Sequence, residues 1–516
     1  MVQFPKIIQG GMGVGVSNWR LAQAVSKIGQ LGVVSGTALD QLFVRRLADG
    51  DPGGEMRRGV DAFPFPAMAR RIWQEYFVQG GKANSAPYPT TLMHRLRDSR
   101  KRVDDSRKMI ELCIVSNFVE VFLAKEGHKN PVGINFLEKV QLPHLPSIYG
   151  AMLAGVGYVL MGAGIPLHIP GVLDAFAAQH AAEYKLTVAG AAPTMDTMMR
   201  FDPAEYGEGL LPVLIRPRFL AIISSNTLAN TLVRRANGRV DGFVIETPIA
   251  GGHNAPPRGK LLLSDSGEPI YGDRDAVNLA DMRTLGVPFW LAGGYGRPGK
   301  LADALAEGAE GVQVGTAFAF TDESGLRPEH KQAVINDVLA GGGAVYTDPL
   351  ASPTGFPFKV VQLKGSSSEP AVYEARTRVC DLGYLREPYA DPDGSVGYRC
   401  AAEPVANYVA KGGRVEDTIG RKCLCNALLA DIGYQQIRKD GSIEPALLTA
   451  GDDLPTIGQF LAPGKTSYCA ADVVKALLGT ELAQTAGEQA GEQEQMNHPI
   501  SPANQLFPGT LVPSIA

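Results

Sequence analysis

Three apolar runs in the second half of this sequence end in glycine-rich corners, and one corner carries a histidine. The runs cover residues 242–245, 288–291 and 311–314, and their corners contain Gly251-Gly252-His253, Gly293-Gly294 and Gly315-Thr316. Short apolar runs followed by glycine and then a helical pattern are typical of buried parallel strands. Parallel strands end on one face, so these glycine corners become neighbours in space. Two adjacent corners predict a phosphate site built from backbone N–H groups, although one corner alone is explained by a tight turn.

His253 stands at the carboxyl end of a strand, where barrel enzymes place their reacting groups. A neutral or protonated imidazole there orients an anionic substrate or donates a proton to a carbanion. The alternative is a histidine that caps a loop carbonyl. No G-x-S-x-G motif follows a strand, which disfavours a serine hydrolase.

Five earlier apolar runs complete a pattern of eight strands, at residues 5–10, 31–35, 131–136, 157–161 and 219–224. Residues 185–188 are also strand-like, but 219–224 lead directly into a helical pattern over 227–235, so we interpret the later run as the fifth strand. Helices are predicted between the strands, including 171–182 and a first helix with Ser17 as its N-cap. This alternation predicts an α/β fold, a right-handed (β/α)8 TIM barrel.

The barrel is expected to comprise residues 1–36 and 130–320. Residues 37–129 are too long for a βα connection and predict a helical insertion on the active face after the second strand. The stretch before the fifth strand predicts a second insertion, with a hairpin that carries 193–203. Residues 321–480 lack the βα rhythm and are expected to be a C-terminal elaboration packed on the barrel. Residues 481–516 form a low-complexity tail.

The composition is that of a soluble enzyme, with 45% hydrophobic and 20% charged residues and a net charge of −4. The charges are interspersed, so neither a nucleic-acid partner nor a membrane partner is expected. Residues 141–173 carry no formal charge, but glycine and proline interrupt them repeatedly, which favours a buried helix and strand over a membrane span. With no apolar leader at the start of the chain, we expect a cytoplasmic protein.

Five of the six cysteines lie in the C-terminal part of the sequence: the pair Cys423-Leu424-Cys425, with Cys380, Cys400 and Cys469. The group invites a metal or iron–sulfur interpretation. Its spacing is not C-x2-C, and two paired knuckles are absent. We therefore expect buried free thiols and no metal site.

Five motifs at the expected strand ends resemble the nitronate monooxygenase (2-nitropropane dioxygenase) family and its relative, the FMN-dependent type II enoyl-ACP reductase. These motifs are Gln9-Gly10-Gly11-Met12, Gly133-Ile134-Asn135-Phe136, Glu246 ahead of Ala250-Gly251-Gly252-His253, Ala292-Gly293-Gly294-Tyr295-Gly296, and the run from Gly311 to Phe318. The match covers roughly residues 5–320. After the histidine it departs from the family, because Asn254 to Gly259 replace the usual Gly or Arg-Gly.

The resemblance implies a TIM barrel with non-covalent FMN and assigns a role to each motif. Gly11 and Met12 would lie along the flavin ring, which Asn135 would hydrogen-bond. Gly251 and Gly252 would approach the ribityl chain, and Gly293, Gly294, Gly315 and Thr316 would bind the phosphate. His253 matches the active-site histidine. Glu246 either contacts the cofactor or is a buried carboxylate paired with Arg258.

The expected function is an FMN-dependent oxidoreductase of the nitronate monooxygenase type, which oxidises a small anionic substrate with dioxygen as acceptor. The first alternative is an enoyl-thioester reductase that uses NAD(P)H as reductant, with an acyl-carrier protein as partner and the helical insertion as its docking surface or lid. The second alternative is a non-catalytic barrel that binds a phosphate ligand. A homodimer is compatible with each of the three.

Overall fold

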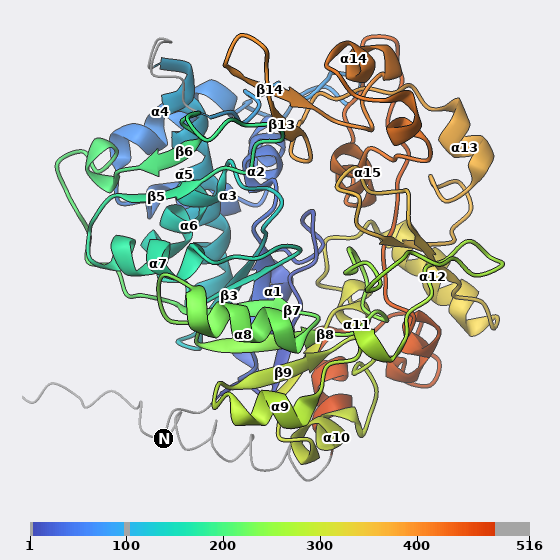
Figure 1. Ribbon diagram of the computed structural model, residues 1–516. Helices are drawn as coiled ribbons and strands as arrows, with labels where there is room; N and C mark the ends of the chain where they lie inside the picture. The colour runs from blue at the N-terminus through green and yellow to red at the C-terminus, as the bar shows by residue number, and fades with distance from the viewer. Residues whose placement is uncertain (1–3, 97–103, 480–516) are drawn as a thin grey trace, which may run out of the picture.

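Eight parallel strands form the centre of the molecule (Figure 1). The computed structural model describes residues 4–96 and 104–479. Neighbouring strands follow the order β1-β10-β9-β8-β7-β4-β3-β2. Their bounds are β1 Ile7–Gln9, β2 Gly32–Ser35, β3 Val132–Leu137, β4 Tyr158–Gly162, β7 Arg218–Ile223, β8 Gly242–Glu246, β9 Phe289–Ala292 and β10 Gly311–Val314. All eight predicted strands are present, and the choice of 219–224 as the fifth is confirmed.

The sheet closes into a barrel between β1 and β2. Ile8 and Leu31 form a parallel bridge, with Gln9 N donating to the Leu31 carbonyl at 2.9 Å and Leu31 N to the Ile7 carbonyl at 3.0 Å. On the opposite side of β1, Ile7 pairs with Val312 of β10. The (β/α)8 TIM barrel predicted from the alternation of strands and helices is therefore confirmed.

Alternate strand residues fill the barrel interior, as the two-residue period of a strand requires. One buried cluster consists of Ile8, Leu31, Val33, Tyr158, Leu160, Leu220, Val244, Trp290 and Ala292. Trp290 is fully buried, and its indole N–H donates to the Pro5 carbonyl at 2.8 Å. The intervening side chains, such as Phe219 and Phe243, belong to the larger core formed with the helices.

Helices of ordinary βα length connect most of the strands. They are α1 Trp19–Lys27, α6 His144–Leu153, α7 Ile169–Ala177, α8 Asn226–Arg235, α9 Leu279–Thr284, α10 Lys300–Ala306 and the short α11 Thr316–Ala319. The prediction of Ser17 as the N-cap of α1 is wrong, because Asn18 accepts from Leu21 N. Ser17 instead turns back to the corner after β1, where its hydroxyl donates to the Gly10 carbonyl and accepts from Met12 N.

Two longer connections depart from this pattern. Between β2 and β3 lie α2 Leu39–Ala48, α3 Glu55–Asp61, α4 Pro66–Tyr76 and α5 Asp104–Lys125. Between β4 and β7, the strands β5 Ala182–Lys185 and β6 Met198–Phe201 pair as an antiparallel hairpin, which confirms the predicted hairpin. The helix predicted over 171–182 ends at Ala177, since Gln179 adopts a left-handed conformation with φ of 61° and Ala182 begins β5.

The chain beyond β10 is rich in loops. Its elements are α12 Pro328–Leu339, β11 Val345–Asp348, β12 Phe358–Val361, α13 Pro370–Ala375, β13 Glu387–Ala390, β14 Val396–Arg399, α14 Val405–Ala410, α15 Leu424–Asp431 and the 3-10 helices η3 Val415–Thr418 and η4 Leu454–Phe460. In Figure 1 they lie on the side of the molecule opposite α4 to α7. The predicted tail 481–516 lies outside the described residues.

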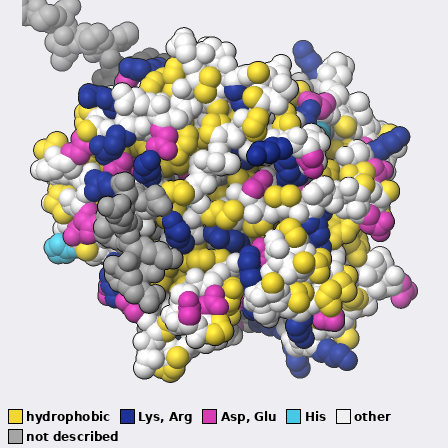
Figure 2. Space-filling view, turned by 90° about the horizontal axis from the view of Figure 1, so that it is seen from above, with side chains coloured by type: hydrophobic (Ala, Val, Ile, Leu, Met, Phe, Trp, Pro, Cys, Tyr) yellow, Lys and Arg dark blue, Asp and Glu magenta, His cyan; other side chains and the backbone are white. Residues whose placement is uncertain are grey.

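The surface of the molecule shows mixed charge. On the face drawn in Figure 2, lysine and arginine side chains alternate with acidic and hydrophobic ones, and neither sign forms a continuous field. None of the helices in the described residues combines the length and apolar content needed to cross a bilayer.

Candidate cofactor and active site

A cavity of about 230 Å³, called the main cavity below, lies at the carboxyl ends of the barrel strands. All eight strands or the loops that follow them contribute to its wall. It brings together every residue singled out in the sequence: Gly11, Met12, Asn135, Glu246, Gly251, Gly252, His253, Gly293, Gly294, Gly315 and Thr316. The neighbourhood predicted for the glycine corners is therefore present, while the role of each residue remains a prediction.

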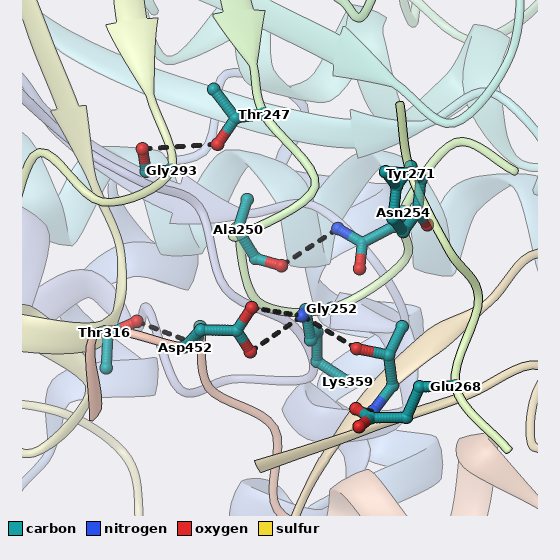
Figure 3. Close-up of polar contacts among 12 residues, drawn as sticks. Thr247, Ala250, Gly252, Asn254, Glu268, Tyr271, Gly293, Thr316, Lys359 and Asp452 are labelled. Carbon is teal, nitrogen blue, oxygen red and sulfur yellow. Dashed lines mark hydrogen bonds and ion pairs between the residues drawn. The ribbon is translucent and has the colours of Figure 1, made fainter. Parts of the chain in front are cut away.

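The corners after β9 and β10 offer main-chain donors to this cavity. Gly293 and Gly294 have φ values of 84° and 78°, which disfavour any residue with a Cβ. A Cβ on Gly293 would also lie 2.3 Å from Thr247 Oγ1, whose hydroxyl donates to the Gly293 carbonyl (Figure 3). The N–H groups of Gly294, Gly315 and Thr316 have no acceptor among the described residues. They remain available to an anionic ligand.

A further part of the cavity wall is formed by the loop after β1, next to the corner after β10, and by β3. A Cβ on Gly11 would lie only 2.3 Å from the Cβ of Asn135, so glycine is needed for this approach of β1 to β3. The Asn135 side-chain amide makes no hydrogen bond within the described part of the chain and lines the cavity. Met12 lies beside Gly315, because a Cβ on that glycine would be 3.7 Å from the Met12 sulfur. The predicted ring site and the predicted phosphate site are therefore adjacent.

His253 is held by residues of the C-terminal region. Its Nε2 lies 2.7 Å from Ser352 Oγ, and its ring packs edge-on against Phe358 with centroids 4.8 Å apart. Burial lowers the pKa of His253 from 6.5 to about 4. The imidazole is consequently neutral at pH 7 in this structure, which favours the uncharged one of the two protonation states considered in the sequence analysis.

Glu246 ends β8 and lines the main cavity without an ion pair in the described structure. Its predicted alternative partner, Arg258, donates to the Ser224 carbonyl at 3.1 Å instead. Burial raises the pKa of Glu246 from 4.5 to about 8. At pH 7 the group is therefore a neutral carboxylic acid, which can donate a hydrogen bond into the cavity.

Residues of the C-terminal region complete the wall of the main cavity, and the sequence did not identify them. We call this set the roof: Tyr384, Leu385, Leu424, Cys425, Leu428, Thr449, Ala450 and Asp453. The segment 449–453 is fastened directly to the corner after β8. Gly252 N donates to Thr449 Oγ1 at 2.8 Å, and a Cβ on Gly251 would lie 2.7 Å from the Ala450 carbonyl carbon.

An ion pair between a buried lysine and a half-exposed aspartate supports the same segment (Figure 3). Lys359 Nζ contacts both carboxylate oxygens of Asp452, at 2.7 and 2.6 Å, and donates to Thr347 Oγ1 at 2.8 Å. The backbone N–H of Lys359 donates to the Gly252 carbonyl at 2.9 Å. On the barrel side, Gly451 N donates to Thr316 Oγ1 at 2.9 Å. The roof therefore rests on the corners after both β8 and β10.

Tyr384 connects the roof with the helices inserted after β2. Its hydroxyl donates to Asp40 Oδ1 in α2, while Asp40 Oδ2 lies 2.9 Å from His94 Nε2. Cys113 Sγ of α5 lies 3.7 Å from the same His94 nitrogen. All four side chains are buried. The hydrogen bonds with His94 and Tyr384 hold the pKa of Asp40 below its usual value despite the opposing effect of burial.

The charges in the main cavity are few. No lysine or arginine is found among the described residues that line it, and its two acids are Glu246 and Asp453. Burial raises the pKa of Asp453, while a hydrogen bond with Thr316 opposes that shift. An anion in this cavity must therefore be held chiefly by hydrogen-bond donors rather than by cationic side chains.

A family model described as nitronate monooxygenase matches residues 216–341. The probable nitronate monooxygenase of Bacillus subtilis (strain 168) is 35% identical over 112 residues, which is 22% of this chain and 30% of that protein. The probable nitronate monooxygenase of Staphylococcus haemolyticus (strain JCSC1435) is 34% identical over 121 residues, 23% of this chain and 32% of that protein. The matches thus span about a third of the length of these relatives.

Among solved structures, FabK from Thermotoga maritima aligns with 17% identity and a TM-score of 0.42, covering 95% of this chain and 96% of that one. Nitroalkane oxidase from Streptomyces ansochromogenes aligns with 16% identity and a TM-score of 0.42, covering 95% and 97%. Because both TM-scores are below 0.5, the assignment of a barrel rests on the strand topology of this chain. The sequence matches confirm the resemblance predicted from the motifs over residues 216–341, from β7 through α12, where the chain is similar to nitronate monooxygenases.

Proposed function

We propose that this protein is an FMN-dependent oxidoreductase of the nitronate monooxygenase type, which oxidises a small anionic substrate with dioxygen as acceptor. The observation that carries the proposal is the convergence of all the predicted cofactor residues on one cavity at the strand ends. The matching segment 216–341 includes the three glycine corners and His253. FMN, when bound, supplies the redox centre that takes electrons from the substrate and passes them to the acceptor.

The residues present fit the chemistry of FMN. Its phosphate carries close to two negative charges and requires donors. The N–H groups of Gly294, Gly315 and Thr316 would meet this need, because the three residues line the cavity and their N–H groups have no acceptor in the described structure. On β3, the unpaired amide of Asn135 supplies a donor and an acceptor, as a flavin ring edge requires.

Two neutral groups would hold the substrate anion. Glu246 donates from its carboxylic acid, since its pKa is raised to about 8. The neutral imidazole of His253 carries one proton, and in the tautomer in which Ser352 Oγ donates to Nε2 that proton is on Nδ1, from which it would be donated to the anion. Hydrogen bonds from neutral donors stabilise an anion in a cavity that lacks cationic side chains, and a nitronate has two oxygen atoms to accept them.

A specific observation favours a second candidate, an enoyl-thioester reductase with NAD(P)H as reductant. A second cavity of about 270 Å³ adjoins the main one and shares Tyr384 and Leu385 with it. An extended acyl-thioester would occupy both cavities, whereas a small nitronate needs only the first. In this candidate function, an acyl-carrier protein would deliver the acyl-thioester. A non-catalytic phosphate-binding barrel remains the third candidate.

Anaerobic reduction of the purified full-length protein separates the three candidates. A flavin absorption spectrum is expected, and its absence excludes both oxidoreductases. Bleaching by a nitronate but not by NADH or NADPH supports the monooxygenase. Rapid bleaching by a pyridine nucleotide, followed by reoxidation with an enoyl-thioester, overturns it in favour of the reductase.

His253→Ala tests the assignment of the active-site histidine. The variant is expected to keep its flavin spectrum and to lose turnover by about 100-fold, the size of one hydrogen-bonding or proton-transferring group. His180→Ala is the control, because His180 is exposed and lines none of the described cavities. Turnover of His253→Ala within twofold of that of the control would remove His253 from the active site.

A further inference from the structure

The cavity that adjoins the main one carries cationic side chains, which the main cavity lacks. This second cavity has a volume of about 270 Å³ and shares Tyr384 and Leu385 with the main cavity. Three cations and two acids line it: Lys139, Arg386, Arg399, Glu138 and Glu387. Cations are therefore in excess here, whereas the described lining of the main cavity has two acids and neither lysine nor arginine.

We propose that the second cavity binds an anionic group of the substrate, a carboxylate or a phosphate, and that Arg386 is the residue that holds it. The reacting end of the same molecule would occupy the main cavity. The inference rests on the proposed function only for the chemistry of that reacting end. It makes the substrate an elongated molecule with an apolar body between two polar ends.

Arg386 is held in a fixed position without a counter-charge. Its Nε donates to the Gly383 carbonyl at 3.0 Å, and Nη2 donates to the His94 carbonyl at 2.6 Å. Its guanidinium carbon lies 4.8 Å from the ring centroid of Tyr398. No carboxylate of the described residues forms an ion pair with it. Of the five N–H groups of a guanidinium, two are used by carbonyls and three remain for a ligand.

Arg399, the other arginine of this cavity, differs because it is already neutralised. Its Nε donates to Glu387 Oε2 at 2.9 Å, and Nη1 donates to the Lys411 carbonyl at 3.1 Å. An unpaired guanidinium in a half-buried position has a desolvation cost that no charge partner offsets, and a bound anion would supply that partner. The contrast between the two arginines assigns the ligand to Arg386.

The remaining charged groups of the second cavity follow one another after β3. Glu138 accepts from Gln141 Nε2 at 2.7 Å, and burial raises its pKa. Lys139 is exposed, and its Nζ lies 5.3 Å from the ring centroid of Phe356. It makes no ion pair with the described part of the chain. An exposed cation on the wall attracts an anion from solvent, and Arg386 then binds it.

Two segments of the chain pass directly from one cavity to the other. Residues 135–137 line the main cavity, and residues 138–143 line the second. In the C-terminal region, Tyr384 and Leu385 line both cavities, and Arg386 follows them at once. The Cα atoms of adjacent residues are about 3.8 Å apart, so Arg386 stands at the boundary between the cavities.

The wall between the polar groups is apolar. Val140, Leu142, Leu186 and Leu385 all line the second cavity. Such a surface accommodates an alkyl or acyl chain, because burial of that chain removes apolar area from water. A ligand held by Arg386 at its anionic end could therefore reach the main cavity past Leu385.

Calorimetric titration of the full-length protein tests the anion site without any turnover. The probes are octanoate, octyl phosphate and uncharged octanol, which share one apolar chain. At least one of the two anions should bind about tenfold more tightly than octanol, the size of one charge-assisted hydrogen bond. The tighter of the two identifies the group as carboxylate or phosphate. Equal affinity for all three probes would overturn the proposal.

Arg386→Gln should abolish the preference for the anion, because it removes the charge and most of the donors. Arg414→Gln is the matched control, since it removes an equal charge from an exposed arginine that lines neither cavity. A preference that persists in Arg386→Gln would overturn the assignment. If that variant does not fold, phenylglyoxal modification of the wild type replaces it. Octyl phosphate or octanoate should protect Arg386 from the reagent, and unprotected modification would overturn the assignment.

Turnover distinguishes this inference from the proposed function. The substrates are a nitronate with a terminal carboxylate and its methyl ester. The ratio of their KM values, carboxylate over ester, should be about tenfold higher in Arg386→Gln than in Arg414→Gln. An equal ratio in the two variants would overturn the inference. If neither nitronate is turned over, the proposed function fails, and the calorimetric comparison still decides whether the anion site exists.

Discussion

The barrel corners and the roof contribute to the main cavity with different parts of the chain. After β8, β9 and β10 the wall is mainly backbone, with Gly251, Gly252, Gly293, Gly294 and Gly315 in succession. The roof contributes mainly side chains, which are large in Tyr384 and Leu424 and polar in Thr449 and Asp453. Backbone donors suit any phosphate, whereas side chains give a cavity its individual shape. The corners therefore explain what this protein shares with its relatives, and the roof is where its substrate preference would arise.

The largest effect is expected at the ion pair that supports the roof. The Lys359 side chain is 3% exposed and that of Asp452 is 45% exposed. Asp452→Ala leaves a buried ammonium with only Thr347 as partner and should lower the free energy of unfolding by about 2–3 kcal/mol. Lys359→Met leaves a hydrated carboxylate and a well-packed stem, so it should cost only about 1 kcal/mol. Urea unfolding of the two full-length variants measures the difference.

If the two substitutions lower the free energy of unfolding equally, the pair behaves as a surface ion pair. Removing either partner would then change that free energy by less than about 1 kcal/mol. The segment 449–453 would then be held chiefly by its hydrogen bonds with Gly252, Thr316 and Ile249.

The next largest effect is expected at a corner. Gly293→Ala strains a residue with φ of 84° and brings a Cβ to 2.3 Å from Thr247 Oγ1. The corner must shift, so FMN affinity should fall by at least about tenfold, or 1.4 kcal/mol. Gly299→Ala is the matched control, because its φ is 85° but no atom lies within 4 Å of the added Cβ. It should lose stability by about 1 kcal/mol and keep FMN affinity.

Fluorescence titration of the apoprotein with FMN provides the readout. A similar loss of affinity in both variants would show that backbone strain, and not the corner itself, governs binding.

The barrel could be predicted from the sequence because its signals are local. Each strand is a short apolar run, and the glycines follow at the positions where the backbone has positive φ or where another chain segment approaches closely. Two apolar runs were candidates for the fifth strand. We chose 219–224 because a helical pattern follows it directly, and the structure confirms that choice. The predicted N-cap of α1 was wrong by one residue. Ser17 and Asn18 both have side chains that can cap a helix, and only the folded structure shows that Asn18 accepts from Leu21 N.

The roof could not be predicted in this way. Tyr384, Leu424 and Asp453 lie in a loop-rich region whose path is set by long-range contacts, such as the hydrogen bond between Tyr384 and Asp40. Nor does the spacing of Cys380, Cys400, Cys423 and Cys425 follow a local motif, because three separate segments bring them together. Their concentration within 46 residues was visible in the sequence, but it did not show that they line one small cavity.

A smaller effect is expected at Ser352, a residue of the C-terminal region that contacts His253 at the end of a barrel strand. Ser352 Oγ lies 2.7 Å from His253 Nε2 and also 2.8 Å from Thr354 Oγ1. Ser352→Ala frees the imidazole to change its tautomer, so turnover should fall about fivefold while FMN affinity stays unchanged. Ser352→Thr should restore most of the activity, because it retains the hydroxyl. The ratio of kcat to KM across pH measures the effect, and a normal value in Ser352→Ala would leave His253 independent of the C-terminal region.

The smallest effect is expected at Asp453, the acid that the roof places beside the corner proposed to bind the phosphate. Its carboxylate lies near Gly296, because a Cβ there would be 3.1 Å from Asp453 Oδ2, and a Cβ on Gly451 would be 2.9 Å from Asp453 Oδ1 and 3.1 Å from Thr316 Oγ1. Burial already raises the pKa of Asp453, and a phosphate dianion would raise it further. FMN binding is thus coupled to proton uptake, and affinity should fall as pH rises through this pKa. Asp453→Asn mimics the protonated acid, so it should bind FMN about threefold more tightly than the wild type at alkaline pH and equally well at acid pH, with a flatter profile. An unchanged pH profile would show that the cofactor phosphate lies away from the roof, against the barrel corners only.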